Sequence, residues 1–236
     1  MTPRTRWALL AVLLVAFAAA VVVAGQPGEA PPVAGVQRLG PESGELVADY
    51  LRRAAGSLPA AGRPEVWALV QLDGYLDPVA AAVLVQGSRL SGVVLRVPLP
   101  GVQTALVFRD LPGQHPAAEL VAAMRAAGAD RARAATQAPP TSRAAAVAAV
   151  EAARLRASCA CVLALLVRAD GAALRELAAR PGIRAVQAAS PGTPRAGLAI
   201  SPLLPEQRFV VGPVPDQGPV LDQGPVPPVP SIPPRR

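Results

Sequence analysis

The sequence predicts an α+β domain between an N-terminal transmembrane helix and a disordered, proline-rich C-terminal tail. Three observations support this organisation. Residues 7–25 form an uncharged apolar run, residues 41–205 alternate between strand-like and helix-like apolar patterns, and residues 206–236 are rich in proline and glycine. We therefore expect a membrane segment at 1–25, a linker at 26–40, the domain at 41–205 and the tail at 206–236.

The apolar run at 7–25 has the length of a membrane-spanning helix. At about 1.5 Å per residue it extends about 28 Å, close to the hydrocarbon thickness of a bilayer. Arg4 and Arg6 precede the run, which favours a cytoplasmic N-terminus and an extracytoplasmic domain. The protein would then be a single-pass protein of the cell membrane. The alternative is a signal peptide cleaved before Gly25, which would release a secreted protein.

The positive charge of the chain comes entirely from arginine. The sequence has 23 basic residues, none of them lysine, against 16 acidic ones, which gives a formal net charge of +7. The arginines are scattered, and aromatic residues make up only 3% of the chain, so few side chains could stack on bases. We therefore expect no nucleic-acid partner. A surface attracted to anionic lipid or to an acidic wall polymer fits this charge better.

The first half of the domain predicts a helix and then a strand–helix–strand unit. Residues 44–55 have the apolar periodicity of an amphipathic helix, and residues 66–72 are apolar on both faces, as in an interior strand. Asp77 followed by Pro78 predicts a helix start, because Asp caps the first turn and proline needs no N–H there. Two strands are expected to follow, at 93–97 and 104–108.

The second half begins with an alanine-rich helical tract. Pro116 starts a helix that breaks near residues 138–140, and Thr141 or Ser142 caps the next one. A strand at 161–167, a helix at 172–179 and a strand at 183–189 follow. This order repeats that of residues 66–97, with an Asp-Gly turn after each first strand. The two strand–helix–strand units predict a ferredoxin-like α/β sandwich, with helices on one face of a mixed sheet.

The tail contains a six-residue repeat. Its copies, GPVPDQ, GPVLDQ and GPVPPV, run from Gly212 to Val229. Such a segment buries too little apolar surface to offset its ordering entropy, so we expect it to be disordered and partly polyproline II. The tail is either a stalk or ligand for a proline-binding partner, or the end of a linker that no protein recognises specifically.

Few residues qualify as catalytic groups or metal ligands. His115 is the only histidine, and its place before Pro116 indicates a helix-entry residue rather than a ligand. Four aspartates lie at strand ends or turns, where capping explains them more simply than a carboxylate pair. They are Asp73, Asp77, Asp110 and Asp170. No phosphate-binding, dinucleotide-binding or nucleophile-elbow motif is present. We therefore expect a protein that is not an enzyme, with no catalytic residue, cofactor, metal ion or small-molecule substrate.

Cys159 and Cys161 are the two cysteines of the chain and a candidate disulfide. In an extended strand their Cα atoms would lie about 6.5–7 Å apart, at the outer limit for a disulfide, so a bridge requires a bend between helix and strand. Three interpretations stay open: a local disulfide clip, two buried thiols, or a redox site. We expect both sulfurs to face the same side of the strand as Leu163, Leu165 and Val167. A sulfur–sulfur distance of about 2.05 Å would show the clip.

Two resemblances add to this interpretation. The elements SCACVLALLV, LAARPGIRAVQAA and ISPLLPEQ, in the last third of the ordered region, resemble a family of membrane-anchored or exported proteins of high-GC Gram-positive bacteria. That family has no established activity, so the resemblance implies a location and no catalytic residue. Separately, LRELAARPGIRAVQ is similar to the closing helix and strand of subtilase propeptides, which fold as ferredoxin-like modules.

The sequence therefore predicts a non-enzymatic, membrane-anchored binding or scaffolding protein of the cell envelope. Its expected partners are the membrane, through the one N-terminal helix, and an envelope protein. Two alternatives stay open. One is a thiol–disulfide exchange protein that uses Cys159 and Cys161, and the other is a protease-inhibitor-like module built like a subtilase propeptide.

Overall fold

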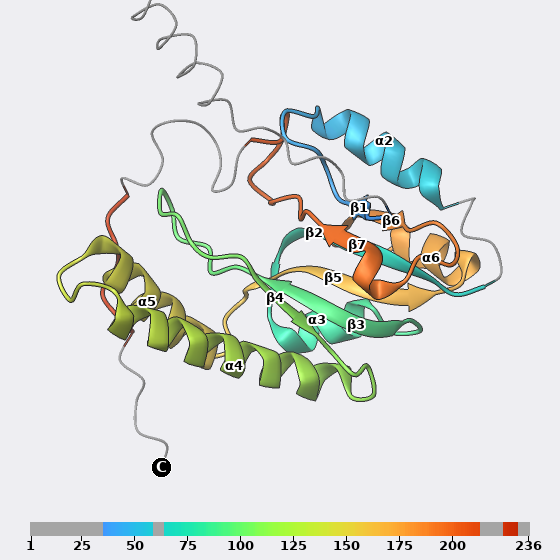
Figure 1. The fold of residues 1–236 in the computed structure, drawn as a ribbon. Coiled ribbons are helices and arrows are strands. Elements are labelled where there is room, and N and C mark those ends of the chain that lie inside the picture. Colours follow the sequence, from blue (N-terminus) through green and yellow to red (C-terminus); the bar gives the residue numbers. More distant parts are fainter. Residues whose placement is uncertain (1–34, 59–63, 213–223, 231–236) are drawn as a thin grey trace, which may run out of the picture. The chain divides into compact units, whose positions relative to one another are not determined.

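The computed structural model of the chain describes residues 35–58, 64–212 and 224–230 (Figure 1). Val36–Arg236 form one compact unit. The run at 7–25, predicted to be a transmembrane helix or a signal peptide, lies outside the described residues. Within the described ranges, no helix is both long enough and apolar enough to cross a membrane.

The described chain is an α+β domain, as predicted. Its main sheet and the connections within it comprise β2 (Val66–Leu76), α3 (Pro78–Leu84), β3 (Arg89–Leu95), β4 (Val107–Asp110), α4 (Pro116–Gln137), α5 (Arg143–Arg156), β5 (Val162–Ala169), α6 (Gly171–Ala178) and β6 (Ile183–Ala188). The remaining elements are β1 (Gln37–Leu39), α2 (Val47–Ser57), the 3₁₀ turn η2 (Arg195–Gly197) and β7 (Leu198–Ile200).

The main sheet has the strand order β4-β3-β5-β2-β6, and all its neighbouring strands are antiparallel. β5 lies between β2 and β3, the strands joined by α3, and β2 lies between β5 and β6, the strands joined by α6. The two predicted strand–helix–strand units are therefore present, and each inserts a strand into the other. The predicted mixed sheet is wrong, because this insertion separates the strands that run parallel. In the described ranges, parallel pairing occurs only between β1 and β7, in a separate sheet.

Both faces of the main sheet are covered, so the prediction of helices on one face only is wrong. Val70 and Leu165 face a core shared with α3, α4, α5 and α6. Leu69 and Leu166 face the opposite way, into a second cluster with β1 and β7. α2 lies on the side of the sheet away from α3 and α4 (Figure 1). The physical reason lies in β2 and β5, which are apolar on both faces and therefore need a layer on each side.

A buried glutamine joins the second layer to the sheet. Gln71 lies on β2 and points toward α2, where its Nε2 donates to the Tyr50 hydroxyl at 3.1 Å. Its Oε1 accepts from the backbone N–H of Leu203 at 3.0 Å. Both polar atoms of the Gln71 side chain therefore have hydrogen-bond partners, as a buried amide requires.

The domain extends beyond the predicted bounds of 41–205. β1 lies inside the predicted linker, and residues 206–212 pack on the domain instead of starting the tail. The Val47 N–H donates to the Phe209 carbonyl and the Val211 N–H donates to the Glu45 carbonyl, each at 2.9 Å. The Val211 side chain is buried against α2. The chain therefore returns to the start of α2 before the repeats begin.

Candidate functional site

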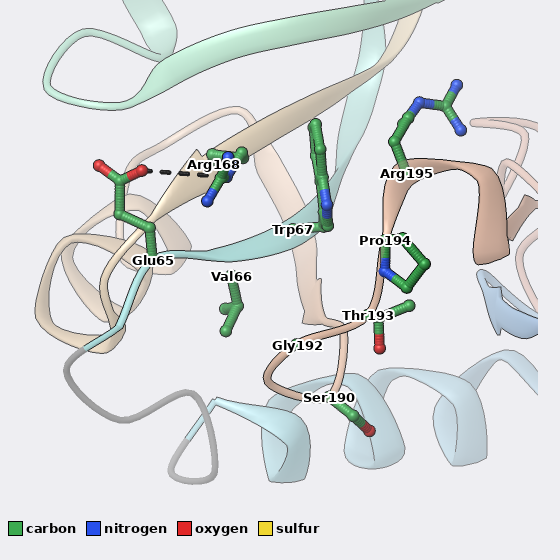
Figure 2. A pocket seen from close by; sticks show the side chains of 9 residues that line it. All are labelled: Glu65, Val66, Trp67, Arg168, Ser190, Gly192, Thr193, Pro194 and Arg195. Atoms are coloured by element: carbon green, nitrogen blue, oxygen red, sulfur yellow. Dashed lines mark ion pairs between the residues drawn. The ribbon is translucent and has the colours of Figure 1, made fainter.

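The candidate site is a cleft at the end of the sheet where β2 and β3 begin and β5 ends (Figure 2). Three side chains form a row across these strands, because Arg168 is in register with both Trp67 and Arg89. Residues in register on antiparallel strands project to the same face. The row lies on the face that carries the second layer, since Trp67 packs against that cluster.

The central contact is between Arg168 and Trp67. The guanidinium carbon lies 5.2 Å from the centre of the indole ring, the arrangement of a cation–π pair. The Nε of Arg168 lies 3.9 Å from a Glu65 carboxylate oxygen, which is an ion pair but too long for a hydrogen bond. This Nε is buried and has no hydrogen-bond partner in the described part of the chain. Arg168 therefore keeps donor capacity that the protein does not use.

One wall of the cleft is the loop that follows β6 and leads to Arg195. Gln37 of β1 fixes this loop by accepting from the Ser190 N–H at 2.9 Å and from the Thr193 hydroxyl at 3.1 Å. Arg195 then reaches Asp110 at the end of β4, with its Nε and Nη2 donating to Oδ1 at 3.0 and 2.6 Å. The wall is thus tied to both β1 and the edge of the sheet.

Two adjoining hollows make up the cleft, and they share Trp67, Arg168 and Arg195. One has a volume of about 310 Å³ and includes Glu65, Ser190 and Thr193, while the other has about 350 Å³ and includes Arg89 and Asp110. The cleft therefore contains three guanidinium groups and two carboxylates. Arg89 is exposed and forms no ion pair within the described ranges.

This arrangement is suited to binding an anion beside a flat group. Guanidinium groups bind carboxylates and phosphates through paired N–H donors. The exposed part of the Trp67 ring offers an apolar surface on which a sugar or peptide could pack. The net positive charge would attract an acidic ligand from solution.

The residues predicted as catalytic or metal-binding candidates do not converge. Asp77 and Asp170 cap α3 and α6, as expected. Asp73 is exposed within β2, between the paired residues Leu72 and Leu76, and the exposed His115 stands before α4 without a side-chain capping bond. Asp110 is the exception, since it lies in the cleft. In the part of the chain that the structure describes, no three His, Cys, Asp or Glu residues could hold one metal ion.

Cys159 and Cys161 form a disulfide, with their Cα atoms 5.3 Å apart. The bend comes from the end of α5, where Ser158 has a φ of 55° and the Cys159 N–H donates back to the Arg154 carbonyl. This is a helix end with a left-handed residue. Cys161 is buried and Cys159 is half-buried.

The predicted orientation of the cysteines is correct for two of three neighbours. Cys161, Leu165 and Val167 belong to the core under the helices, and Cys159 packs against it. Leu163 belongs to the opposite cluster, so that part of the prediction is wrong. The reason is an irregularity in β5, because pairing with β3 skips Leu163 and reverses the alternation of side chains there.

A second polar cluster lies at the other end of the sheet, beside the disulfide. The buried Arg96 donates its backbone N–H to the Cys161 carbonyl at 2.9 Å. Its Nη1 contacts the hydroxyl of Tyr75 and lies 3.1 Å from Glu206 Oε1. The Tyr75 hydroxyl lies 3.1 Å from both oxygens of Glu206. The SCAC and PLLPEQ elements therefore meet at one arginine.

Glu151 adds a buried carboxylate on α5. It accepts from the Ala105 N–H at 2.6 Å and from Arg131 Nε at 2.7 Å. Burial raises the pKa of this carboxyl, against the opposing effects of the Ala105 N–H and of Arg131. These two hydrogen bonds connect the segment at Ala105 to α5 and α5 to α4. Glu151 therefore has a structural role.

Comparison with known proteins adds no identification: no family model, curated protein or solved structure matches the chain. The resemblance to envelope proteins of high-GC Gram-positive bacteria therefore stays a prediction. The function has to be argued from the residues themselves.

Sequence reasoning missed the cleft. Trp67 lies in a predicted strand, Arg168 directly follows another, and Arg195 belongs to a segment without a strong pattern. The sequence does show a tryptophan near the start of one strand and an arginine near the end of another. This pair indicates a site only when the register of the two strands is known.

Proposed function

We propose that the protein is a non-enzymatic binding module of the cell envelope, and that the cleft around Trp67 holds an anionic group of an envelope component. The observation that carries this proposal is the state of Arg168. Its guanidinium is stacked on an indole ring and has a buried Nε without a hydrogen-bond partner in the described ranges. The Arg168 side chain is still 38% exposed, so a guanidinium that is already held in place can bind an anion from solution.

The ligand class follows from the charges around Arg168. Arg89 and Arg195 flank it, and of the two carboxylates Glu65 is held only at 3.9 Å. A carboxylate or phosphate could therefore bind Arg168 at little cost to existing contacts. The extent of the two adjoining hollows suits a segment of polymer, such as an acidic wall polymer, better than an isolated ion.

The location rests on the sequence. The uncharged run at 7–25, preceded by Arg4 and Arg6, supports a membrane anchor with the domain on the extracytoplasmic side. The disulfide supports the same side of the membrane, because disulfides persist in oxidising compartments. Signal-peptide cleavage and secretion would place the cleft in the same compartment. For the core of the domain we propose a ferredoxin-like topology, with a second layer added to it. The interleaved strand–helix–strand units support this proposal.

Binding can be tested by the fluorescence of Trp67. The full chain with Trp7→Phe leaves Trp67 as the only tryptophan. Poly-glutamate and polyphosphate are titrated as acidic probes, with neutral dextran as the uncharged one. We expect a fluorescence change with the acidic probes only, weakened when salt is raised from about 0.05 to 0.5 M because exposed charges are screened.

The matched variants are Arg168→Gln and Arg125→Gln. Both remove one positive charge, but Arg125 is exposed on α4, away from the cleft. Loss of a charged hydrogen bond costs about 1.5–3 kcal/mol, so Arg168→Gln should weaken binding about tenfold or more. An equal effect of both substitutions would mean that net charge alone attracts the probes, and the proposal would be wrong.

Thiol–disulfide exchange at Cys159 and Cys161 and inhibition of secreted subtilases stay predictions. The burial of Cys161 leaves Cys159 as the sulfur that an attacking thiolate could reach more easily. Reduction of insulin by the dithiol form would favour exchange, and inhibition of a subtilase would favour the propeptide-like alternative.

A further inference from the structure

The third copy of the tail repeat lies against the domain. Residues 224–230 follow the first two copies and consist of GPVPPV with a final proline. The Gly224 N–H donates to the Gly101 carbonyl at 2.7 Å, and Val226 packs on the core under the helices. The predicted disorder of the tail is therefore wrong for this segment.

The contact at Gly224 admits no side chain. A Cβ atom at this position would lie 2.5 Å from the Pro100 carbonyl oxygen and 2.7 Å from the Gly101 oxygen. Both of these are backbone atoms, which cannot rotate away. Glycine is therefore required for the segment to approach the turn so closely.

The receiving surface is built by the Pro98–Gly101 turn and by α4 and α5. Arg154 of α5 holds the turn, with its Nη1 donating to the Pro98 carbonyl at 3.2 Å. Beyond the turn, alanines of both helices line a shallow, mainly apolar groove of about 420 Å³ that also includes Arg156, Val229 and Pro230. The lining alanines are Ala132, Ala135, Ala149, Ala152 and Ala153. The small alanine side chains leave room for the segment beside the two helices.

The chemistry of the groove distinguishes the three repeat copies. All share Gly-Pro-Val, the part that contacts the turn and the core. The first two copies end in Asp-Gln, whereas the third ends in Pro-Val. In the third copy Val229 lies at the alanine groove, with 51% of its surface exposed. A glutamine at that place would replace the apolar side chain that faces the alanines with a polar one.

We propose that the turn and the groove between α4 and α5 form a recognition site for a Gly-Pro-Val-Pro-Pro-Val segment, and that the chain's own residues 224–230 occupy it as a displaceable latch. A polyproline II segment loses little conformational entropy on binding, which suits such a site. Because the segment is covalently attached to the domain, its effective concentration at the site is high, and a free peptide competes with it poorly. The site is separate from the Trp67 cleft and does not depend on the function proposed for it.

The test uses the full chain and a fluorescent peptide with the sequence of residues 224–230. Gly224→Val should release the latch, whereas Gly218→Val makes the same change in the second copy and serves as the matched control. We expect the peptide to bind the Gly224→Val chain about tenfold or more tightly than the wild type or Gly218→Val, which both keep the latch in place. A peptide with valine for its glycine should not bind.

Alanine-methyl NMR spectra of the same variants provide a second readout. The signals of Ala132 and Ala149 should shift in Gly224→Val and stay unchanged in Gly218→Val. Equal peptide binding to all three chains, or no binding to Gly224→Val at millimolar peptide, would overturn the proposal. A wild-type chain that dimerises with rising concentration, while Gly224→Val stays monomeric, would overturn the assignment to the chain's own tail and identify a second copy as the source.

Discussion

Arg96 has a buried positive charge, and Glu206 is its ion-pair partner within the described ranges. Its side chain is only 4% exposed, and its ion-pair partner Glu206 is 40% exposed. Tyr75 bridges the two, since its hydroxyl contacts both side chains. The Nε of Arg96 has no hydrogen-bond partner in the described ranges. The buried Glu151 also interacts electrostatically with Arg96, but its carboxylate already accepts two hydrogen bonds from other residues. A buried charge without a counter-ion is costly.

Glu206→Gln should therefore destabilise the protein. The glutamine retains the shape of the side chain but removes the negative charge beside Arg96. Removing one member of a fully buried pair costs about 3–5 kcal/mol, and the partial exposure of Glu206 reduces this to about 1–2 kcal/mol. The measurement is the free energy of unfolding in urea.

Glu176→Gln is the matched control for this substitution. Glu176 forms an ion pair with Arg180 on the surface of the protein and is 73% exposed. Its loss should cost about 0.5 kcal/mol or less. Equal effects of the two substitutions would show that Arg96 does not depend on Glu206.

At the scale of elements, the helix starts differ in how they are capped. Asp77 accepts from the N–H groups of Val79 and Ala80, both at 2.9 Å. Asp170 does the same at the start of α6, from Ala172 and Ala173. The side chain of His115, at the start of α4, makes no such bond. There the Glu119 carboxylate instead accepts from the N–H groups of the three residues that precede the helix, Gly113, Gln114 and His115.

Asp77→Ala and Asp170→Ala should each destabilise the protein by about 1 kcal/mol, because each leaves two N–H groups of a first turn without an acceptor. For a domain of this size the melting temperature should fall by about 2–4 °C in each case. His115→Ala should change it by less than half as much, since the histidine side chain caps nothing. Scanning calorimetry measures all three, and a large effect of His115→Ala would contradict this assignment of roles.

These starts were predictable because their signals are local. An Asp followed by Pro or Gly and an apolar helical pattern specifies an N-cap within a few residues, whatever the rest of the chain does. β1 and β7 were missed for the opposite reason. Each has three residues, and Gln37 pairs with Leu198 across 161 positions of sequence, so neither strand has a pattern of its own.

At the scale of the whole molecule, the second layer accounts for most of the features that could not be predicted from the sequence. The apolar character of β2 on both faces was read correctly, but it specifies only that something covers each face. The second face is covered by β1, β7 and α2, and the hydrogen bond between Gln71 and Tyr50 joins α2 to the sheet. The Trp67 cleft depends on the same layer, since the Ser190–Arg195 wall is held by Gln37 of β1. Neither could be placed without strand register.

The composition of the chain allows the ionisation of its two tyrosines to be measured without interference from lysine. The chain has two tyrosines and no lysine, and the described cysteines are not free. Tyr50 and Tyr75 are therefore the side chains that ionise between about pH 9 and 12. Burial raises the pKa of Tyr50 to about 12, and burial also raises the pKa of Tyr75, against the effect of Arg96.

The protein should therefore lose stability as the pH rises above 10. A phenol whose folded pKa is raised contributes stability that is fully present below the unfolded pKa of about 10 and is lost as the pH approaches the folded pKa. For Tyr50, a folded pKa near 12 corresponds to about 2–3 kcal/mol lost between pH 10 and 12. Urea denaturation at several pH values measures this loss. Tyr50→Phe should reduce the loss over this range, and Tyr75→Phe should reduce it separately. If both phenols of the native protein ionised near pH 10, as followed by ultraviolet absorbance, the burial of Tyr50 between α2 and the sheet would be contradicted.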